Sequence, residues 1–322
     1  MKCAVLAWAV LVCLAAPLGA AERYALVITG ASGDAKFGQR YDDWRERLTT
    51  VLADRLAFGR DHLVVLAEKA GPGVQVANRD NVRSALAGLA SRMHKQDLLL
   101  VVLIGHGSYD GTTAKFNLVG PDLDAGEWAS LLRPIPGKLI FVDTTSSSFP
   151  FLQAVSSKGR VVITATDSHA ARYDTVFAEQ FIKALETSTS GITVSDRLSI
   201  WDVFAATTAG VRRHYEQEGL LPVEHALLDD AGDGFGKDAE QPGLDTSIAQ
   251  ATYLTGDAAE QALDPALREL LARRDDLLDA IDKLKAQKAK LEASQYEVRL
   301  EQLLVDLAKV SRALRARQGT WH

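Results

Sequence analysis

Short apolar runs alternate with amphipathic segments along the first two thirds of the chain. Apolar runs without polar alternation predict strands at residues 24–29, 62–66, 97–105, 138–143 and 160–165. Apolar side chains at helical spacing predict helices at residues 41–56, 78–93, 176–185 and 200–216. This order predicts an α/β domain at residues 22–240, with a mostly parallel sheet covered by helices on both faces.

The pattern changes at residues 264–318. Leucines recur every seven residues from Leu270, and a four-three apolar spacing follows from Tyr296. The two registers do not match, and residues 294–297 have the form of a capping box, which is typical of a new helix start. We therefore expect a coiled-coil-like hairpin of two antiparallel helices, after a linker at residues 241–263. One long helix is the alternative, and the hairpin is a candidate surface for homo-oligomerisation.

The first 21 residues have the pattern of a secretory signal peptide. Lys2 is the only charged residue before Glu22, and an apolar run is followed by small residues that permit cleavage after Ala20 or Ala21. The apolar run is too short for a comfortable membrane span. We therefore expect a secreted or periplasmic protein that has no membrane span once the signal peptide is removed.

Both cysteines of the chain, Cys3 and Cys13, lie within this expected signal peptide. The mature chain would therefore contain neither a disulfide nor a thiol nucleophile. The net charge of −6 does not support a nucleic-acid partner, since such proteins carry basic surfaces. No pattern in the sequence indicates a cofactor.

Three polar clusters directly follow predicted strands. They are residues 105–107, which place His106 between two glycines, residues 143–146 and residues 166–168. The carboxyl ends of parallel strands meet at one edge of a sheet, where α/β proteins have their binding sites. We therefore expect the three clusters to form one site.

The order of these segments resembles the legumain-like and caspase-like peptidases. In that family an apolar strand ends in a His-Gly pair, and the next core strand ends in an acidic residue, a small residue and the nucleophilic cysteine. The resemblance covers roughly residues 22–235 and implies a caspase-like sheet with His106 and Gly107 at one strand end and Asp143 at the next. Alignment without gaps puts Thr145 at the cysteine position, and a shift of one residue puts Ser146 there.

Neither hydroxyl readily replaces a thiolate. A hydroxyl is a much weaker acid than a thiol, and it needs a base in strict alignment and a formed oxyanion hole. The leading hypothesis is an exported, non-catalytic relative of these peptidases, a pseudoenzyme that binds a peptide or protein. The alternatives are a hydrolase in which His106 activates Thr145 or Ser146, and an unrelated α/β binding protein.

A separate group of carboxylates, Asp229, Asp230 and Asp233, lies beside glycines. Such oxygen ligands make it a candidate calcium site. The group lacks the regular spacing and terminal glutamate of an EF-hand loop, so a solvated turn is the favoured interpretation.

Overall fold

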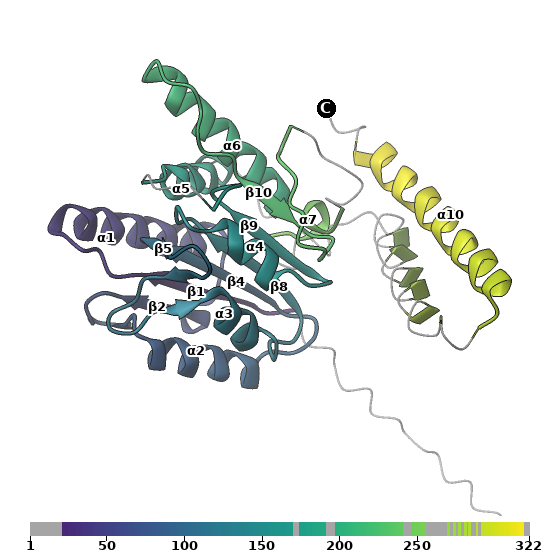
Figure 1. The fold of residues 1–322 in the computed structure, drawn as a ribbon, viewed down its shortest axis with the longest axis horizontal. Coiled ribbons are helices and arrows are strands. Elements are labelled where there is room, and N and C mark those ends of the chain that lie inside the picture. Colours follow the sequence, from purple (N-terminus) through teal and green to yellow (C-terminus); the bar gives the residue numbers. More distant parts are fainter. Residues whose placement is uncertain are drawn as a thin grey trace, which may run out of the picture.

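A computed structural model describes residues 21–169, 174–190, 197–240 and 247–255, together with parts of 269–292 and the helix that follows. A seven-stranded sheet forms the centre of the protein, with the strand order β10-β9-β8-β4-β1-β2-β3 (Figure 1). All neighbouring strands are parallel except β9 and β10, which confirms the prediction of a mostly parallel sheet. The strands are β1 (Arg23–Thr29), β2 (Leu63–Ala67), β3 (Val74–Val76), β4 (Leu98–Ile104), β8 (Lys138–Asp143), β9 (Arg160–Thr164) and β10 (Leu227–Asp229).

Helices cover both faces of this sheet, as the sequence predicts. All seven side chains of the central strand β4 are buried, because successive residues point to opposite faces and helices cover both. Val102 therefore belongs to the apolar core on one face, and Val101 to the core on the other. One face carries α1 (Ala35–Thr50), α5 (Phe177–Ser188) and α6 (Ile200–Gln217), and the other carries α2 (Arg79–Arg92), α3 (Ala125–Leu132) and α4 (Phe149–Val155).

Side-chain caps determine where several of the helices begin. Asn78 accepts the Asn81 N–H over 2.8 Å, so α2 starts where the sequence predicts a capped helix. By contrast, α1 starts six residues before the predicted position at 41, because Asp34 accepts the Phe37 N–H over 2.9 Å. The earlier start matters for the site, since it brings Phe37 into a helix that borders it.

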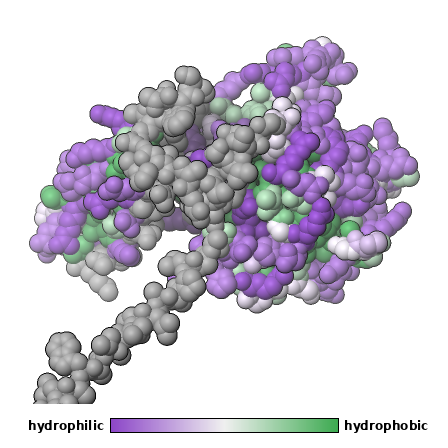
Figure 2. Space-filling model, turned by 180° about the vertical axis from the view of Figure 1, so that it is seen from behind, coloured by the Kyte–Doolittle hydropathy of each residue, from purple (hydrophilic) through white to green (hydrophobic). Residues whose placement is uncertain are grey.

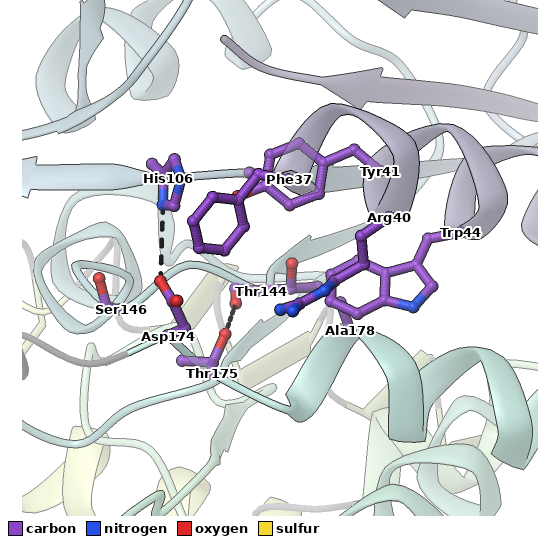
Figure 3. A pocket seen from close by; sticks show the side chains of 11 residues that line it. Phe37, Arg40, Tyr41, Trp44, His106, Thr144, Ser146, Asp174, Thr175 and Ala178 are labelled. Atoms are coloured by element: carbon purple, nitrogen blue, oxygen red, sulfur yellow. Dashed lines mark hydrogen bonds and ion pairs between the residues drawn. The ribbon is translucent and has the colours of Figure 1, made fainter. Parts of the chain in front are cut away.

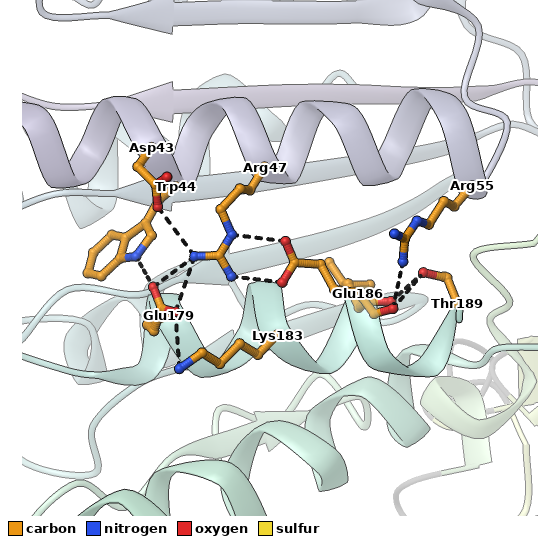
Figure 4. Close-up of polar contacts among 9 residues, drawn as sticks. Asp43, Trp44, Arg47, Arg55, Glu179, Lys183, Glu186 and Thr189 are labelled. Atoms are coloured by element: carbon orange, nitrogen blue, oxygen red, sulfur yellow. Dashed lines mark hydrogen bonds and ion pairs between the residues drawn. The ribbon is translucent and has the colours of Figure 1, made fainter. Parts of the chain in front are cut away.

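A polar network around Arg47 joins α1 to α5 (Figure 4). Arg47 Nε and Nη2 donate to the two carboxylate oxygens of Glu186 over 2.9 and 2.7 Å. Nη1 lies 3.1 Å from both oxygens of Glu179, which also accepts the Trp44 indole N–H. The Arg47 hydrogen bonds hold the pKa of the Glu186 carboxyl below its ordinary value. These hydrogen bonds from the planar Arg47 guanidinium hold α1 and α5 in a fixed position relative to each other.

Several short elements are not predicted by the sequence pattern. They are α3, α4, the edge strands β3 and β10, and a small antiparallel sheet formed by β5 (Gly107–Tyr109), β6 (Ala114–Phe116) and β7 (Leu123–Asp124). Each has between two and eight residues, which is too short for hydrophobic periodicity to distinguish a helix from a strand. The small sheet begins at Gly107, so it extends directly from the expected site.

Arg23, at the start of β1, connects the two ends of the α/β domain. Its guanidinium donates to the carbonyl oxygens of Leu56, Ala57 and Leu254 over 2.6, 3.0 and 2.7 Å. Leu254 follows α7 (Ser247–Ala251) and is completely buried in the same core as α6. Residues 247–255, which the sequence pattern places in a linker, therefore pack as part of the domain.

The C-terminal residues form helices separate from the sheet. α10 (Ala293–Gln318) begins after a non-helical residue pair at 291–292, close to the predicted interruption. The helical residues that the structure describes between 269 and 284 run beside α10 in the opposite direction (Figure 1). Near the turn, the Lys288 ammonium lies 5.5 Å from the centre of the Tyr296 ring. Among the described residues of this hairpin, the buried apolar side chains are Leu277, Ile281, Leu284 and Leu314.

Residues 1–20 of the expected signal peptide, which covers residues 1–21, and the rest of the expected linker lie outside the described residues, so both stay predictions. Among the helices that the structure describes, none is long and apolar enough to cross a membrane. On the face of the molecule shown in Figure 2, polar side chains dominate the described surface and apolar ones occur in small areas.

Candidate functional site

The order of the strands in the sheet determines where the expected site lies. From β1 the chain continues to β2 on one side, and it returns to pair β4 on the other side of β1. Such a reversal opens a crevice outside the carboxyl ends of the strands. β4 and β8 are neighbours, with Leu103 opposite Asp143, so the residues that follow these two strands meet at this crevice.

The glycines on either side of His106 are required by close contacts. Gly105 has a φ of +153°, and a β-carbon there would lie 3.2 Å from the Gly30 nitrogen. A β-carbon on Gly107 would lie 2.6 Å from Thr145 Oγ1 and 3.0 Å from Ser147 Cβ. The backbone at 105–107 therefore packs directly against the end of β1 and the segment after β8.

Asp143 ends β8 as a fully buried acid. Its Oδ1 accepts the Thr145 N–H over 2.9 Å, and its Oδ2 has no hydrogen-bond partner among the described residues. Burial raises the pKa of the Asp143 carboxyl to about 7, although the Thr145 N–H and hydroxyl act in the opposite direction. The Thr145 hydroxyl is near enough to influence the carboxyl, but it does not reach hydrogen-bond geometry.

The two hydroxyl candidates differ in where they point. Thr145 is completely buried, with its Oγ1 toward Gly107. Ser146 is half-buried and lines a small cavity together with His106 (Figure 3). The Ser146 carbonyl also accepts the Thr166 hydroxyl over 3.2 Å, so the third predicted cluster reaches the site through Thr166. Only Ser146 of the two hydroxyls faces the cavity beside His106.

His106 is enclosed by residues from two other elements. Its Nδ1 lies 3.8 Å from Asp174 Oδ1, which is a distance for an ion pair rather than a hydrogen bond. Its ring makes edge contacts with Phe37 and Tyr41 of α1, at centroid distances of 4.5 and 5.7 Å. The cavity that remains has a volume of about 20 Å³, which is room for roughly one water molecule.

A buried glutamate holds the segment that carries Asp174. Glu224 accepts the N–H groups of Val176 and Phe177 over 2.7 and 3.2 Å, at the start of α5. It also accepts the Tyr215 hydroxyl over 2.8 Å, and burial raises the pKa of its carboxyl above the ordinary value. Sequence patterns do not identify Asp174 or Glu224 as site residues, because neither follows a predicted strand.

A second and much larger cavity lies next to the first, at the ends of β1 and β2 and the start of α1. Its volume is about 430 Å³. On its wall Ser32, which is buried, donates its hydroxyl to Glu68 over 2.7 Å. Tyr41 lines both cavities, so the two share a wall.

The carboxylates of the candidate calcium site, Asp229, Asp230 and Asp233, instead accept backbone hydrogen bonds that stabilise a turn and a neighbouring helix start. The two oxygens of Asp229 accept the N–H groups of Gly232 and Gly234 over 2.9 and 2.8 Å. Asp230 accepts the Ala249 N–H over 2.7 Å, and Asp233 accepts the Phe235 N–H over 2.8 Å. Within the described part of the chain, no group of three His, Cys, Asp or Glu side chains could hold a metal ion.

Comparison with known proteins gives distant similarities in structure. No protein-family model matches the chain, and no curated protein matches its sequence. The chain is similar to protein GSU0716 from Geobacter sulfurreducens, with a TM-score of 0.46 and 15% identity over 73% of this chain and 99% of that one. It is also similar to caspase-1 from Spodoptera frugiperda, with a TM-score of 0.45 and 10% identity over 65% of this chain and 86% of that one.

Proposed function

We propose that the protein is a non-catalytic relative of the caspase-like peptidases that binds a peptide or protein segment at the carboxyl edge of its sheet. The main support is the position of Thr145. Alignment without gaps puts this residue at the family's nucleophile position, yet it is completely buried and its hydroxyl oxygen packs toward Gly107. A nucleophile must reach the carbonyl carbon of its substrate, and a hydroxyl in this place cannot.

The surroundings of His106 support the same proposal. Phe37 and Tyr41 pack against its ring, and the adjoining cavity of about 20 Å³ has room for roughly one water molecule. A general base must lie within hydrogen-bond reach of the proton that it removes in a bound substrate. His106 is therefore better suited to a packed wall of a binding site.

The neighbouring cavity of about 430 Å³ is the proposed place for the bound segment. Ligand pockets in proteins commonly have volumes of about 300–1,000 Å³. A cavity of this size takes one or two amino-acid side chains. Gln39, which is exposed on α1, lies on its wall and offers a position for a test.

A peptide library provides that test. The protein is incubated with the library, cleavage products are sought by mass spectrometry, and retained peptides are identified and titrated. We expect retention without cleavage, and weaker retention by Gln39→Lys, which crowds the cavity with a longer charged side chain. Gln217→Lys is the matched control, because Gln217 is exposed at the far end of α6. Cleavage that disappears in His106→Ala would contradict the proposal.

One observation favours a second candidate function, a hydrolase with a serine nucleophile. Ser146 and His106 line the same cavity, and the Asp174 carboxylate lies 3.8 Å from His106 Nδ1, where a third group orients the base in known triads. A fluorophosphonate probe tests this candidate directly. Labelling of Ser146 that is lost in His106→Ala but kept in Thr145→Ala would establish it, and absence of labelling would exclude it.

We also propose that the protein is exported. The signal-peptide pattern supports a secreted or periplasmic location, where the partner would be another exported protein or peptide. Cell fractionation, with the chain compared to one that lacks residues 2–21, tests this location. Retention of the full chain in the cytoplasm would contradict it.

A further inference from the structure

Asp97, in the segment just before β4, is a buried carboxylate beside the start of β1. Only 1% of the residue is exposed. Its Oδ1 accepts the backbone N–H of Glu22 over 2.9 Å, and its Oδ2 accepts the backbone N–H of His94 over 2.7 Å. Both oxygens are therefore satisfied, but only by neutral amide groups.

No lysine or arginine among the described residues forms an ion pair with Asp97. The nearest group that can carry positive charge is the His94 imidazole, whose Nδ1 lies 3.5 Å away on a side chain that is 73% exposed. A buried carboxylate without a close cation is costly, because hydrogen bonds from amides replace only part of its lost hydration. A positive charge on one of the two backbone nitrogens that already donate to Asp97, those of Glu22 and His94, would stabilise this carboxylate.

We propose that the mature chain begins at Glu22, and that its new α-ammonium group forms an ion pair with Asp97. This inference rests on the proposed export of the protein. Hydrolysis of the Ala21–Glu22 bond by a leader peptidase adds one water molecule. Ala21 leaves with the carboxylate, and the Glu22 nitrogen becomes an ammonium group that is protonated at neutral pH.

The backbone holds the Glu22 nitrogen in place for this pair. The Glu22 carbonyl accepts the Leu98 N–H over 2.9 Å, and Arg23 is paired in register with Leu98. Cleavage therefore turns an existing 2.9 Å hydrogen bond between the carboxylate and a neutral amide into one in which both partners are charged, with no movement of the chain. The Coulomb attraction between the two opposite charges then adds to this hydrogen bond.

The sequence before Glu22 independently favours this bond. Leader peptidases prefer small residues at the last and third-last positions before the cut. Cleavage after Ala21 places Ala21 and Gly19 at these positions, whereas cleavage after Ala20 would place Leu18 at the third-last one. The alternative cut would also leave an uncharged amide opposite Asp97.

Mass spectrometry of the exported protein tests the position of the cut. We expect a chain that starts at Glu22. A start at Ala21 would overturn the inference while leaving the proposed export intact, whereas an uncut chain that begins at Met1 would overturn both.

Denaturation tests the ion pair separately, with purified chains that start at Glu22. We compare the free ammonium form with the form acetylated at that nitrogen, which restores the amide, at pH 6.5 in urea. The free form should have a folded-to-unfolded ratio about tenfold larger. Equal ratios would overturn the inference, whatever the function of the protein.

Asp97→Asn gives a second measurement on the same pair. The difference between free and acetylated chains should disappear in this variant, because the amide side chain carries no charge. The matched control is Asp61→Asn, since Asp61 is 89% exposed and has no contact with Glu22 among those described. A difference that persists in Asp97→Asn would overturn the pairing.

Discussion

Gly107 and Thr145 pack so closely that a β-carbon on Gly107 would lie 2.6 Å from the Thr145 hydroxyl oxygen. The corner that carries His106 and the segment after β8 are therefore one packed unit. The Thr145 hydroxyl lies inside this unit, and the neighbouring Ser146 faces the cavity.

This contact predicts that Gly107→Ala destabilises the protein. The added methyl group overlaps Thr145 Oγ1 and approaches Ser147 Cβ at 3.0 Å, so the segment after β8 must shift. Overpacking of this kind costs about 1–3 kcal/mol of the free energy of unfolding. Urea denaturation of the two proteins measures the loss.

Gly88→Ala is the matched control for that prediction. Gly88 lies inside α2, and a β-carbon there would meet no atom within 4 Å. Alanine is the better helix former by about 0.5–1 kcal/mol, so this variant should be at least as stable as the original. Adding Thr145→Ala to Gly107→Ala should recover part of the loss. An unchanged stability for Gly107→Ala alone would contradict the close packing.

The buried Asp143 predicts a stability that falls as pH rises. Its pKa is about 7 in the folded protein and about 3.9 in an unfolded chain, so between these values the folded state binds the proton more strongly. Stability from this group is greatest below pH 4 and is lost as pH rises to about 7. Three pKa units correspond to at most about 4 kcal/mol. Urea denaturation from pH 4 to pH 8 measures this slope.

Asp143→Asn should remove that slope, because an amide keeps the acceptor for the Thr145 N–H and does not ionise. The variant should therefore be the more stable protein at pH 8. A smaller slope of the same sign should remain, since burial also raises the pKa of Glu224. The exposed Asp61→Asn is the control, and a slope that is unchanged in Asp143→Asn would refute the assignment.

We expect the protein to lose stability when Arg47 is replaced by lysine. A lysine carries the same charge, but it cannot present two parallel N–H groups to Glu186 and also reach Glu179. We expect Arg47→Lys to cost about 1–2 kcal/mol, since the side chain is 27% exposed and solvent weakens the pairs. Thermal or urea denaturation measures the difference.

Arg60→Lys is the comparison for that variant. Arg60 is 79% exposed and pairs only with Asp54 among the described contacts, so its replacement should change stability by less than about 0.5 kcal/mol. The Arg47 contribution should also fall as pH drops through the lowered pKa of Glu186, because protonation removes the carboxylate charge. Equal effects of the two variants would argue against a special role of Arg47.

The helical hairpin predicts a monomer in solution. Its apolar side chains at Leu277, Ile281, Leu284 and Leu314 are buried within the chain, and so need no second copy. Light scattering should give the mass of one chain. A dimer that dissociates in Val298→Lys, a change at the most exposed of the large apolar side chains described on α10, would instead establish self-association through this helix.

The sequence predicts the sheet well and the site only in part. β4 is recognisable because every residue is apolar, and the His106 corner follows directly from its end. Ser146 faces the cavity and Thr145 does not, because Thr145 packs against Gly107. No local sequence pattern encodes this contact. Asp174 comes from the segment before α5, and its approach to His106 depends on contacts across the fold.

Short elements limit the prediction in a similar way. α4 contains Phe149, Pro150 and Phe151 and is too short for a helical period to show. The sequence pattern places the start of α1 too late, because Asp34 and its cap lie in a polar stretch that resembles a loop. Phe37, which reaches His106 from the first turn of the helix, therefore falls outside the predicted helix.

The Arg23 bridge to Leu254 has a consequence for how the domain can be tethered. It brings the first strand and the last described residues of the domain to one point, at the edge of the sheet where the strands begin. The crevice lies at the opposite edge, about 20 Å away along β1. A partner or surface anchored to either end of the domain would therefore contact the edge of the sheet opposite the crevice. The crevice would then face away from that anchor.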